Sequence, residues 1–215
     1  MSPLNRSSHG DRDNHQPNDA SDRTVIRYAS HRRSRQALGQ GIMRLEEASL
    51  NPPQGLGEFL NDLGAGENGF SGTPVHNGEV SLQDYLQSCC DGRDRSKLKP
   101  GLVPQTIFWL LDSDDKVVGM VKVRHCLAES TRINGGHIGF YVRPSHRGKG
   151  FGKHALALAL EELKKIGERR VLVTVYPENT ASIRIVEANG GRLEDTIFDP
   201  RTKHDINRYW IELKP

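Results

Sequence analysis

The chain has 215 residues, of which 35% are hydrophobic, and it carries a formal net charge of +3 with a mean hydropathy of -0.62. This length is enough for one domain of moderate size, and no stretch approaches the roughly eighteen apolar residues of a membrane span or resembles a signal peptide. The charge is only mildly basic, which argues against a nucleic-acid-binding protein.

Residues 1–23 are predicted to form a disordered polar tail. Ser, Asn, Asp, Arg, His and Pro dominate this segment, so it has too little apolar surface to offset the entropy lost on ordering. Residues 24–215 are predicted to form one domain. We expect this domain in the cytoplasm, because three cysteines, with Cys89 and Cys90 adjacent, do not make a disulfide framework.

The first elements of the domain give weak signals. Residues 24–28 predict a short strand. Residues 35–48 predict a helix, because Leu38, Ile42 and Leu45 recur at helical spacing.

A glycine-rich segment, residues 55–101, follows these elements. Two short helices are predicted within it, over residues 57–63 and 81–89. Ser81 and Asp84 suit the start of the second helix, as a capping residue and a first-turn acid.

The second half of the domain alternates strands and helices. A hairpin, two strand–helix pairs and two final antiparallel strands are predicted. They span residues 106–111 and 117–123, then 137–142, 152–166, 171–176 and 180–189, and finally 192–198 and 207–213. This order places the chain in the α/β class.

The most informative segment runs from the strand at 137–142 through a glycine-rich loop into a helix. Gly148, Gly150 and Gly152 allow the backbone to turn sharply and to approach a ligand. The free N–H groups and positive dipole end of the helix face the same space. This layout predicts a site for a phosphate-bearing cofactor.

The spacing of the loop selects among phosphate-bearing cofactors. A nucleotide-triphosphate loop ends in Gly-Lys-Ser or Gly-Lys-Thr, whereas His154 follows Gly152-Lys153 here. A dinucleotide fingerprint needs G-x-G-x-x-G, and the interval after Gly150 is too short. Neither alternative fits the loop.

The motif Arg147-x-x-Gly150-x-Gly152, preceded by Val142-Arg143-Pro144, resembles the pyrophosphate loop of the GNAT family of N-acetyltransferases. The resemblance covers about residues 105–213 and includes the later Asn179-x-x-Ser182 turn. The ending Arg208-Tyr-Trp-Ile211 is similar to that of a subgroup of predicted acetyltransferases.

The resemblance implies a mixed sheet flanked by helices. Residues 55–101, which precede the region of resemblance, are expected to cover the acceptor site. The resemblance also implies acetyl-coenzyme A as the cosubstrate. No C-x-x-C or H-x-x-x-H pattern indicates a metal site. The residues expected to bind the cofactor are Phe140, Tyr141, Val142, Arg147, Gly148, Lys149, Gly150, Phe151, Gly152, Lys153, Asn179 and Ser182. Asn179 also suits an ordinary helix N-cap.

Acetyl transfer needs an amine that has lost its proton. A lysine-like amine has a pKa of about 10.4, so a general base assists at neutral pH. His137 is the first candidate, because it takes the place of an acidic residue in similar family members. A structural role for His137 is the alternative, and His125 and Glu129 are the reserve candidates for the base.

The departing thiolate needs a proton. Many family members carry a tyrosine for this purpose four residues before a glycine, and Val186 occupies that position here. Tyr141, Tyr176 and Tyr209 are candidate substitutes, with Tyr141 predicted as the catalytic one, and water can also protonate a thiol of pKa about 8.5.

The acceptor is expected to be a primary amine of a small molecule or a peptide. A protein N-terminus or lysine, and a non-catalytic acyl-coenzyme A-binding module, are the alternatives. The oligomeric state, including a homodimer, is left open by the sequence.

Overall fold

The computed structural model describes residues 35–36 and 43–214. The polar tail predicted for residues 1–23 and the strand predicted for residues 24–28 lie outside the described residues. The boundary between tail and domain therefore stays a prediction.

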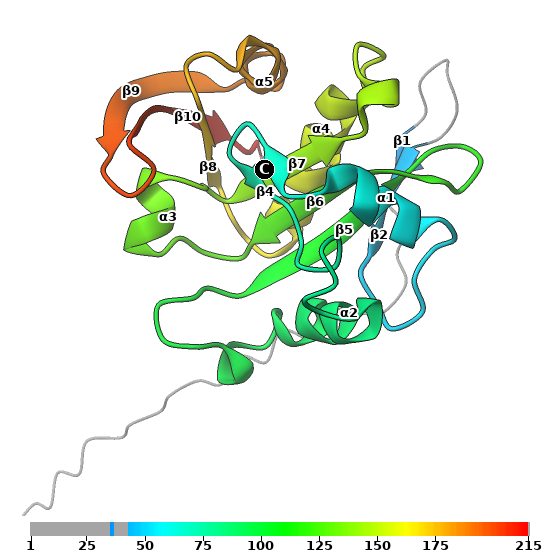
Figure 1. The fold of residues 1–215 in the computed structure, drawn as a ribbon. Helices are drawn as coiled ribbons and strands as arrows, with labels where there is room; N and C mark the ends of the chain where they lie inside the picture. The colour runs from blue at the N-terminus through cyan, green and yellow to red at the C-terminus, as the bar shows by residue number, and fades with distance from the viewer. Residues whose placement is uncertain (1–34, 37–42, 215) are drawn as a thin grey trace, which may run out of the picture. The chain divides into compact units, whose positions relative to one another are not determined.

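Five strands form an antiparallel sheet in the order β1-β2-β5-β6-β7 (Figure 1). Their bounds are Arg35–Gln36, Met43–Glu47, Gln105–Leu111, Val117–Arg124 and Ile138–Val142. The turn between β5 and β6 is held by the Asp112 carboxylate, which accepts the N–H groups of Asp114 and Lys116 at 2.9 Å. This confirms the predicted hairpin and its turn.

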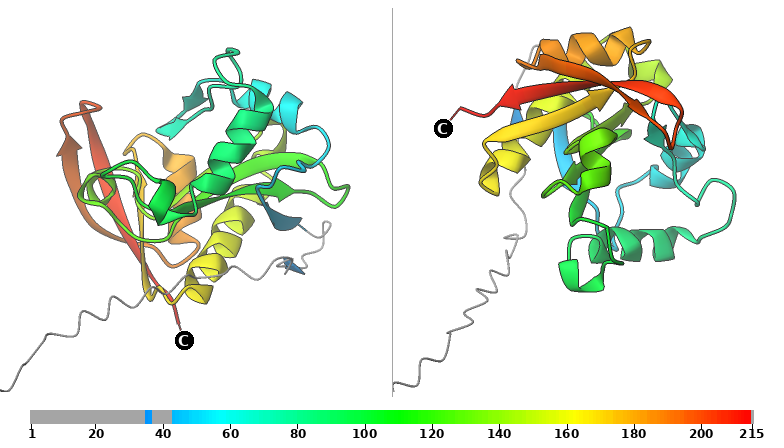
Figure 2. Two further views of the ribbon diagram at one scale, coloured as in Figure 1. Left: turned by 90° about the horizontal axis from the view of Figure 1, so that it is seen from below. Right: turned by 90° about the vertical axis from the view of Figure 1, so that its left-hand side faces the viewer.

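Three further strands form a second antiparallel sheet in the order β8-β10-β9 (Figure 2). Their bounds are Arg170–Val175, His204–Glu212 and Arg192–Asp199. The predicted antiparallel pairing of the last two strands is confirmed by the register that joins Ile206 to Ile197. A helix, α4 (Phe151–Lys165), connects β7 of the first sheet to β8 of the second.

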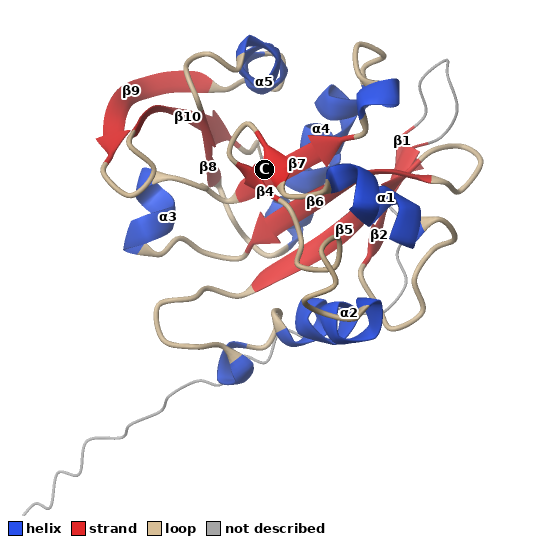
Figure 3. Cartoon of the chain, in the orientation of Figure 1, coloured by secondary structure: helices blue, strands red, loops and turns tan. Residues whose placement is uncertain are grey.

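The helices lie on both sides of the first sheet (Figure 3). Helix α4 packs its buried leucines against β2, β6 and β7 on one side. On the other side, α1 (Leu56–Leu63) and α2 (Leu82–Asp91) pack around Trp109 and Met120. Among the helices of residues 43–214, none is long and apolar enough to cross a bilayer.

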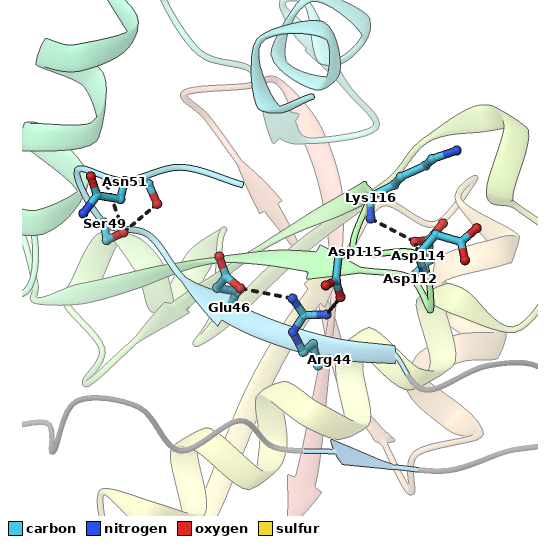
Figure 4. A network of polar contacts seen from close by, with 8 residues as sticks. All are labelled: Arg44, Glu46, Ser49, Asn51, Asp112, Asp114, Asp115 and Lys116. Carbon is cyan, nitrogen blue, oxygen red and sulfur yellow. Dashed lines mark hydrogen bonds and ion pairs between the residues drawn. The ribbon is translucent and has the colours of Figure 1, made fainter. Parts of the chain in front are cut away.

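The helix predicted over residues 35–48 is wrong, because β1 and β2 occupy its described part. Met43 and Leu45 alternate into the core, and Arg44 lies between them. The Arg44 guanidinium pairs with Glu46 and with Asp115 at the β5–β6 turn (Figure 4). Residues 43–47 form a strand because this segment pairs with β5 in the sheet, although the apolar residues at 38, 42 and 45 are spaced as in a helix.

Two small elements were not predicted from the sequence. Helix α3 (Glu129–Ile133) lies in the connection between β6 and β7. A two-stranded hairpin, β3 (Gly66–Glu67) with β4 (Phe70–Ser71), follows α1. Helix α5 (Thr180–Glu187), which was predicted, joins β8 to β9, and two single 3-10 turns, Arg95–Lys97 and Pro144–His146, complete the elements of the described chain.

Candidate active site

The two sheets are fastened together at His137. The His137 N–H donates to the Leu172 carbonyl at 2.8 Å, and the Leu172 N–H donates to Nδ1 of the His137 ring at 2.9 Å. The Gly135 N–H donates to the Thr174 hydroxyl at 2.8 Å. A Cβ at Gly136 would lie 2.4 Å from the Leu172 carbonyl oxygen. Glycine at position 136 therefore lets the chain press directly against β8.

Beyond His137, β7 and β8 separate, since β7 pairs with β6 and β8 pairs with β10. The Arg143 N–H donates to Val118 on β6. Because successive peptides of a strand face opposite edges, the peptide groups of Phe140 face the gap. The N–H and C=O groups of Leu172 face β7. The peptide groups of Thr174, two residues further along β8, therefore face the gap as well. These groups are available to the amides of a ligand.

A cavity of about 110 Å³ lies in this gap. One side is formed by the facing strands, another by the β3–β4 hairpin with the end of β6, and a third by the start of α5 (Thr180–Glu187). The lining residues are Asn68, Gly69, Phe70, Ser71, Lys122, Arg124, Asn134, Gly135, Ile138, Gly139, Phe140, Val173, Thr174, Val175, Tyr176, Asn179 and Ser182. A more open hollow adjoins it along the hairpin.

The glycine loop has the conformation that its sequence predicts. Gly148 and Gly150 have φ values of +74° and +85°, and Gly150 is the N-cap residue of α4. The Lys149 ammonium donates to the Ser145 carbonyl at 3.0 Å, which fixes the loop. Within the described chain, no backbone carbonyl accepts the N–H groups of residues 151–153. Those N–H groups are the ones expected to bind phosphate at a helix start, and this anion site stays a prediction.

The start of α4 adjoins the cavity through Phe140. A Cβ at Gly152 would lie 2.6 Å from Cδ1 of Ile185 on α5 and 3.6 Å from the Phe140 ring. Asn179 caps α5, because its Oδ1 accepts the Ser182 N–H at 3.1 Å. The predicted N-cap is thus confirmed, and the cofactor contact predicted for Asn179 stays a prediction.

Two ion pairs connect the glycine loop and the residues just before it to α1 and β3. Arg143 pairs with Asp62 on α1, and Arg147 pairs with Glu67 on β3. The Arg147 Nε also donates to the Val142 carbonyl at 2.9 Å. The loop and the hairpin that lines the cavity are therefore held to each other by charge.

His137, the predicted base, is buried, with 4% of its surface exposed. Burial first, and then the charge of Arg132, lowers the pKa of His137 to about 4. The cavity lining includes Gly135 before it and Ile138 after it, but not His137. The contacts therefore favour the structural alternative, and the base role stays a prediction.

The two reserve candidates lie outside the cavity lining as well. The His125 ring is hydrogen-bonded to the buried Thr106 hydroxyl at 2.8 Å, and burial lowers the pKa of His125. Glu129 is exposed in the first turn of α3. Neither His125 nor Glu129 therefore lies at the gap between β7 and β8.

The tyrosines separate into core and cavity positions. Tyr209 is buried in the core against α4, and Tyr141 packs against Phe59 and Phe70 with burial raising its pKa. Tyr176, at the end of β8, lines the cavity. Val186, at the family's tyrosine position, is fully buried in the core.

Sequence reasoning missed the side of the cavity that β6 and the hairpin build. Lys122 and Arg124 lie there on one face of β6, beside Asn134. The sequence does contain a signal for the hairpin, because the pair Asn68-Gly69 is typical of a tight hairpin turn. In the structure these residues have the positive φ values of such a turn, +49° and +82°. Nothing in the sequence indicates which residues of β6 face the hairpin.

The substitution Gly72→Ala tests the hairpin's role in the site. A Cβ at Gly72 would lie 1.8 Å from the Gly64 carbonyl oxygen, so the hairpin must move. We expect a loss of stability of about 1–3 kcal/mol, which is typical of overpacking, and a raised acceptor KM. Gly57→Ala on α1, where nothing lies within 4 Å, is the control. An unchanged acceptor KM in Gly72→Ala would contradict this role.

The fold is that of solved acetyltransferases. The ribosomal-protein-S5-alanine acetyltransferase from Vibrio fischeri aligns with a TM-score of 0.60 at 15% identity, covering 85% of this chain and 100% of that one. RimL, a ribosomal L7/L12 α-N-protein acetyltransferase in complex with coenzyme A, gives 0.62 at 15% identity over 84% and 98%. MccE, a microcin C7 self-immunity acetyltransferase in complex with acetyl-CoA and AMP, gives 0.60 at 16% identity over 82% and 98%. The α/β class with flanking helices is thereby confirmed.

Residues 80–190, just over half of the chain, match the model of the acetyltransferase (GNAT) family. The chain belongs to this family and is an acyltransferase. No curated protein matches the sequence. In the part of the chain that the structure describes, no three His, Cys, Asp or Glu side chains are grouped to hold a metal ion.

Proposed function

We propose that the protein transfers the acetyl group of acetyl-coenzyme A to a primary amine of a small molecule or peptide. The observation that carries this proposal is the gap between β7 and β8. It adjoins the start of α4 through Phe140 and contains the cavity. A thioester bound along this gap would have its phosphates at the loop and its acetyl group near the cavity.

In the proposed reaction, the amine nitrogen attacks the thioester carbonyl carbon. A C–N bond forms, the C–S bond breaks, and the nitrogen loses a proton while the thiolate gains one. The peptide groups of Phe140 and Thr174 would orient the pantetheine amides, and an N–H facing the gap would stabilise the carbonyl oxygen as it gains charge. These backbone groups are fixed by the strands and need no rearrangement.

Proton transfer in this reaction has few candidate side chains. The cavity lining contains no histidine and no carboxylate, so we propose that water carries the amine proton out of the site, with His137 as the alternative base. We propose Tyr176, which lines the cavity, as the side chain that protonates the thiolate. Water can replace it, because the pKa of a thiol is only about 8.5.

The test is coenzyme A release by the full chain with acetyl-coenzyme A and a panel of amines and peptides, with the acetylated products identified by mass. Release that depends on an amine, and one acetyl group added per amine, are expected. Acetyl-coenzyme A binding with no product from pH 6 to 9 would instead support a non-catalytic binding module. Efficient turnover only with protein N-termini or lysines would identify a protein acetyltransferase.

A further inference from the structure

A lysine on β6 lies at the wall of the cavity. Lys122 is opposite Gly139 in the register between β6 and β7, and Gly139 has no side chain to cover it. The Lys122 ammonium donates to the Ser71 carbonyl at 2.9 Å and lies 4.3 Å from the centre of the Phe70 ring. The β3–β4 hairpin therefore holds this ammonium at a defined position.

The charge of this wall is not balanced by carboxylates of residues 43–214. Lys122 and Arg124 line the cavity, and its lining contains no aspartate or glutamate. The Arg124 guanidinium donates to the carbonyls of Gly135 and Gly136. Among residues 43–214, neither cation is within ion-pair distance of a carboxylate.

The neighbouring charges are already paired. Glu67 and Arg201 line the adjoining hollow. Glu67 pairs with Arg147, and Arg201 pairs with the fully buried Asp199. Two cations at the cavity therefore remain without a counter-charge from this part of the chain.

An unbalanced cation in a partly buried site is costly, and a bound anion offsets the cost. Burial, and then the charge of Arg124, lowers the pKa of Lys122 to about 8, so the ammonium is still charged at neutral pH. The phosphates of a coenzyme have their own site at the start of α4. The negative charge that balances Lys122 is therefore expected from a second ligand, the acceptor, and not from the coenzyme phosphates.

We propose that the acceptor amine carries an anionic group, a carboxylate or a phosphate, which binds Lys122 with Arg124 beside it. The inference rests on the proposed function and narrows its substrate class to acidic amines such as amino acids or phosphorylated amines. The Ser71 carbonyl and the Phe70 ring hold the ammonium, and its remaining N–H groups bind the anion.

The test compares acceptors that differ only in this charge. L-amino acids are paired with their carboxamides, and O-phosphoethanolamine is paired with ethanolamine. We expect kcat/KM to be about 10- to 100-fold higher for the anionic member, the range for a charged hydrogen bond. The α-amine of a carboxamide is less basic than that of the acid, so its reactivity alone favours the opposite result.

Substitutions at Lys122 test whether this residue causes the preference for anionic acceptors. Lys122→Met should reduce the ratio within each pair to about 1, whereas Lys122→Arg should retain part of it. Lys116→Met, the same change at the β5–β6 turn and outside the cavity lining, should leave the ratio unchanged. Equal rates within the pairs for the native chain would overturn the inference, as would a loss in Lys122→Met confined to the KM for acetyl-coenzyme A.

A binding measurement keeps the inference separate from the proposed function. If no amine is acetylated, the proposed function fails. Calorimetry on the protein saturated with coenzyme A then compares N-acetylglycine, N-acetylglycinamide and the N-acetylated phosphoethanolamine. Binding of the anionic compounds that is lost in Lys122→Met supports the anion site, and equal binding of acid and amide, or none by either, refutes it.

Discussion

Gly150→Val is expected to weaken the binding of acetyl-coenzyme A by about 100-fold or more while the protein remains folded. Each charged hydrogen bond to a phosphate contributes about 1.5–3 kcal/mol, and a side chain at position 150 obstructs the N–H groups of residues 151–153. Gly150 also has a φ of +85°, where a β-branched residue is strained. Calorimetric titration with acetyl-coenzyme A measures the loss.

Gly167→Val is the matched control for this substitution. Gly167 follows the other end of α4, has a φ of +91°, and has nothing within 4 Å of the position of a Cβ. The two valines therefore carry similar backbone strain, and only Gly150 lies at the anion site. Equal coenzyme affinity in the two folded variants would remove the basis for placing the pyrophosphate at this loop.

His137→Leu is expected to reduce stability at pH 7 by about 1–3 kcal/mol, because the Leu172 N–H loses its acceptor in a buried position. His137→Asn should retain much of the stability, since the asparagine Oδ1 takes the place of Nδ1. Denaturant unfolding of both variants measures the difference. If both lose the same stability, the hydrogen bond to Leu172 is not what fastens the strands.

The pH dependence of stability provides a second measurement on His137. Its pKa of about 4 in the folded state lies below the unfolded value of 6.5, so the unfolded chain binds more protons between these values. The contribution of His137 is fully present above pH 6.5 and is lost as the pH falls through 4. Its size, about 3 kcal/mol at most, is the shift multiplied by 1.36 kcal/mol per pH unit.

This contribution should be missing from His137→Asn when its stability is compared with that of the native chain between pH 6.5 and 4. If His137 is instead the general base, its replacement should abolish an acidic limb in the pH–rate profile and lower kcat by about 10²–10⁴ with stability unchanged. The two roles therefore give opposite patterns in stability and turnover.

The second half of the fold could be predicted because its signals are local. Leu156, Leu160 and Leu163 repeat on one face of α4, and the glycine that ends the helix, Gly167, has the positive φ of a left-handed cap. The turns of the glycine loop, with positive φ at Gly148 and Gly150, likewise follow from glycines within one short segment. Short-range patterns of this kind are readable without knowledge of the rest of the chain.

The remainder depends on contacts between distant residues. β2 is a strand because it pairs with β5, and Met43 and Leu45 are as compatible with a helix as with a strand when taken alone. Lys122 faces the cavity because the hairpin around Phe70 and Ser71, some 50 residues earlier, closes over it. Neither relation leaves a pattern within a short window of sequence.

The ion pair between Arg147 and Glu67 has a consequence for how the two predicted binding sites affect each other's affinity. A phosphate bound at the loop would compete with the Glu67 carboxylate for the Arg147 guanidinium. The loss of that ion pair would loosen the hairpin at β3. Thermodynamic linkage requires the converse: a ligand held under the hairpin changes the affinity for the phosphate by the same factor. The two predicted binding sites would then share one coupling free energy, to which the Glu67 carboxylate contributes.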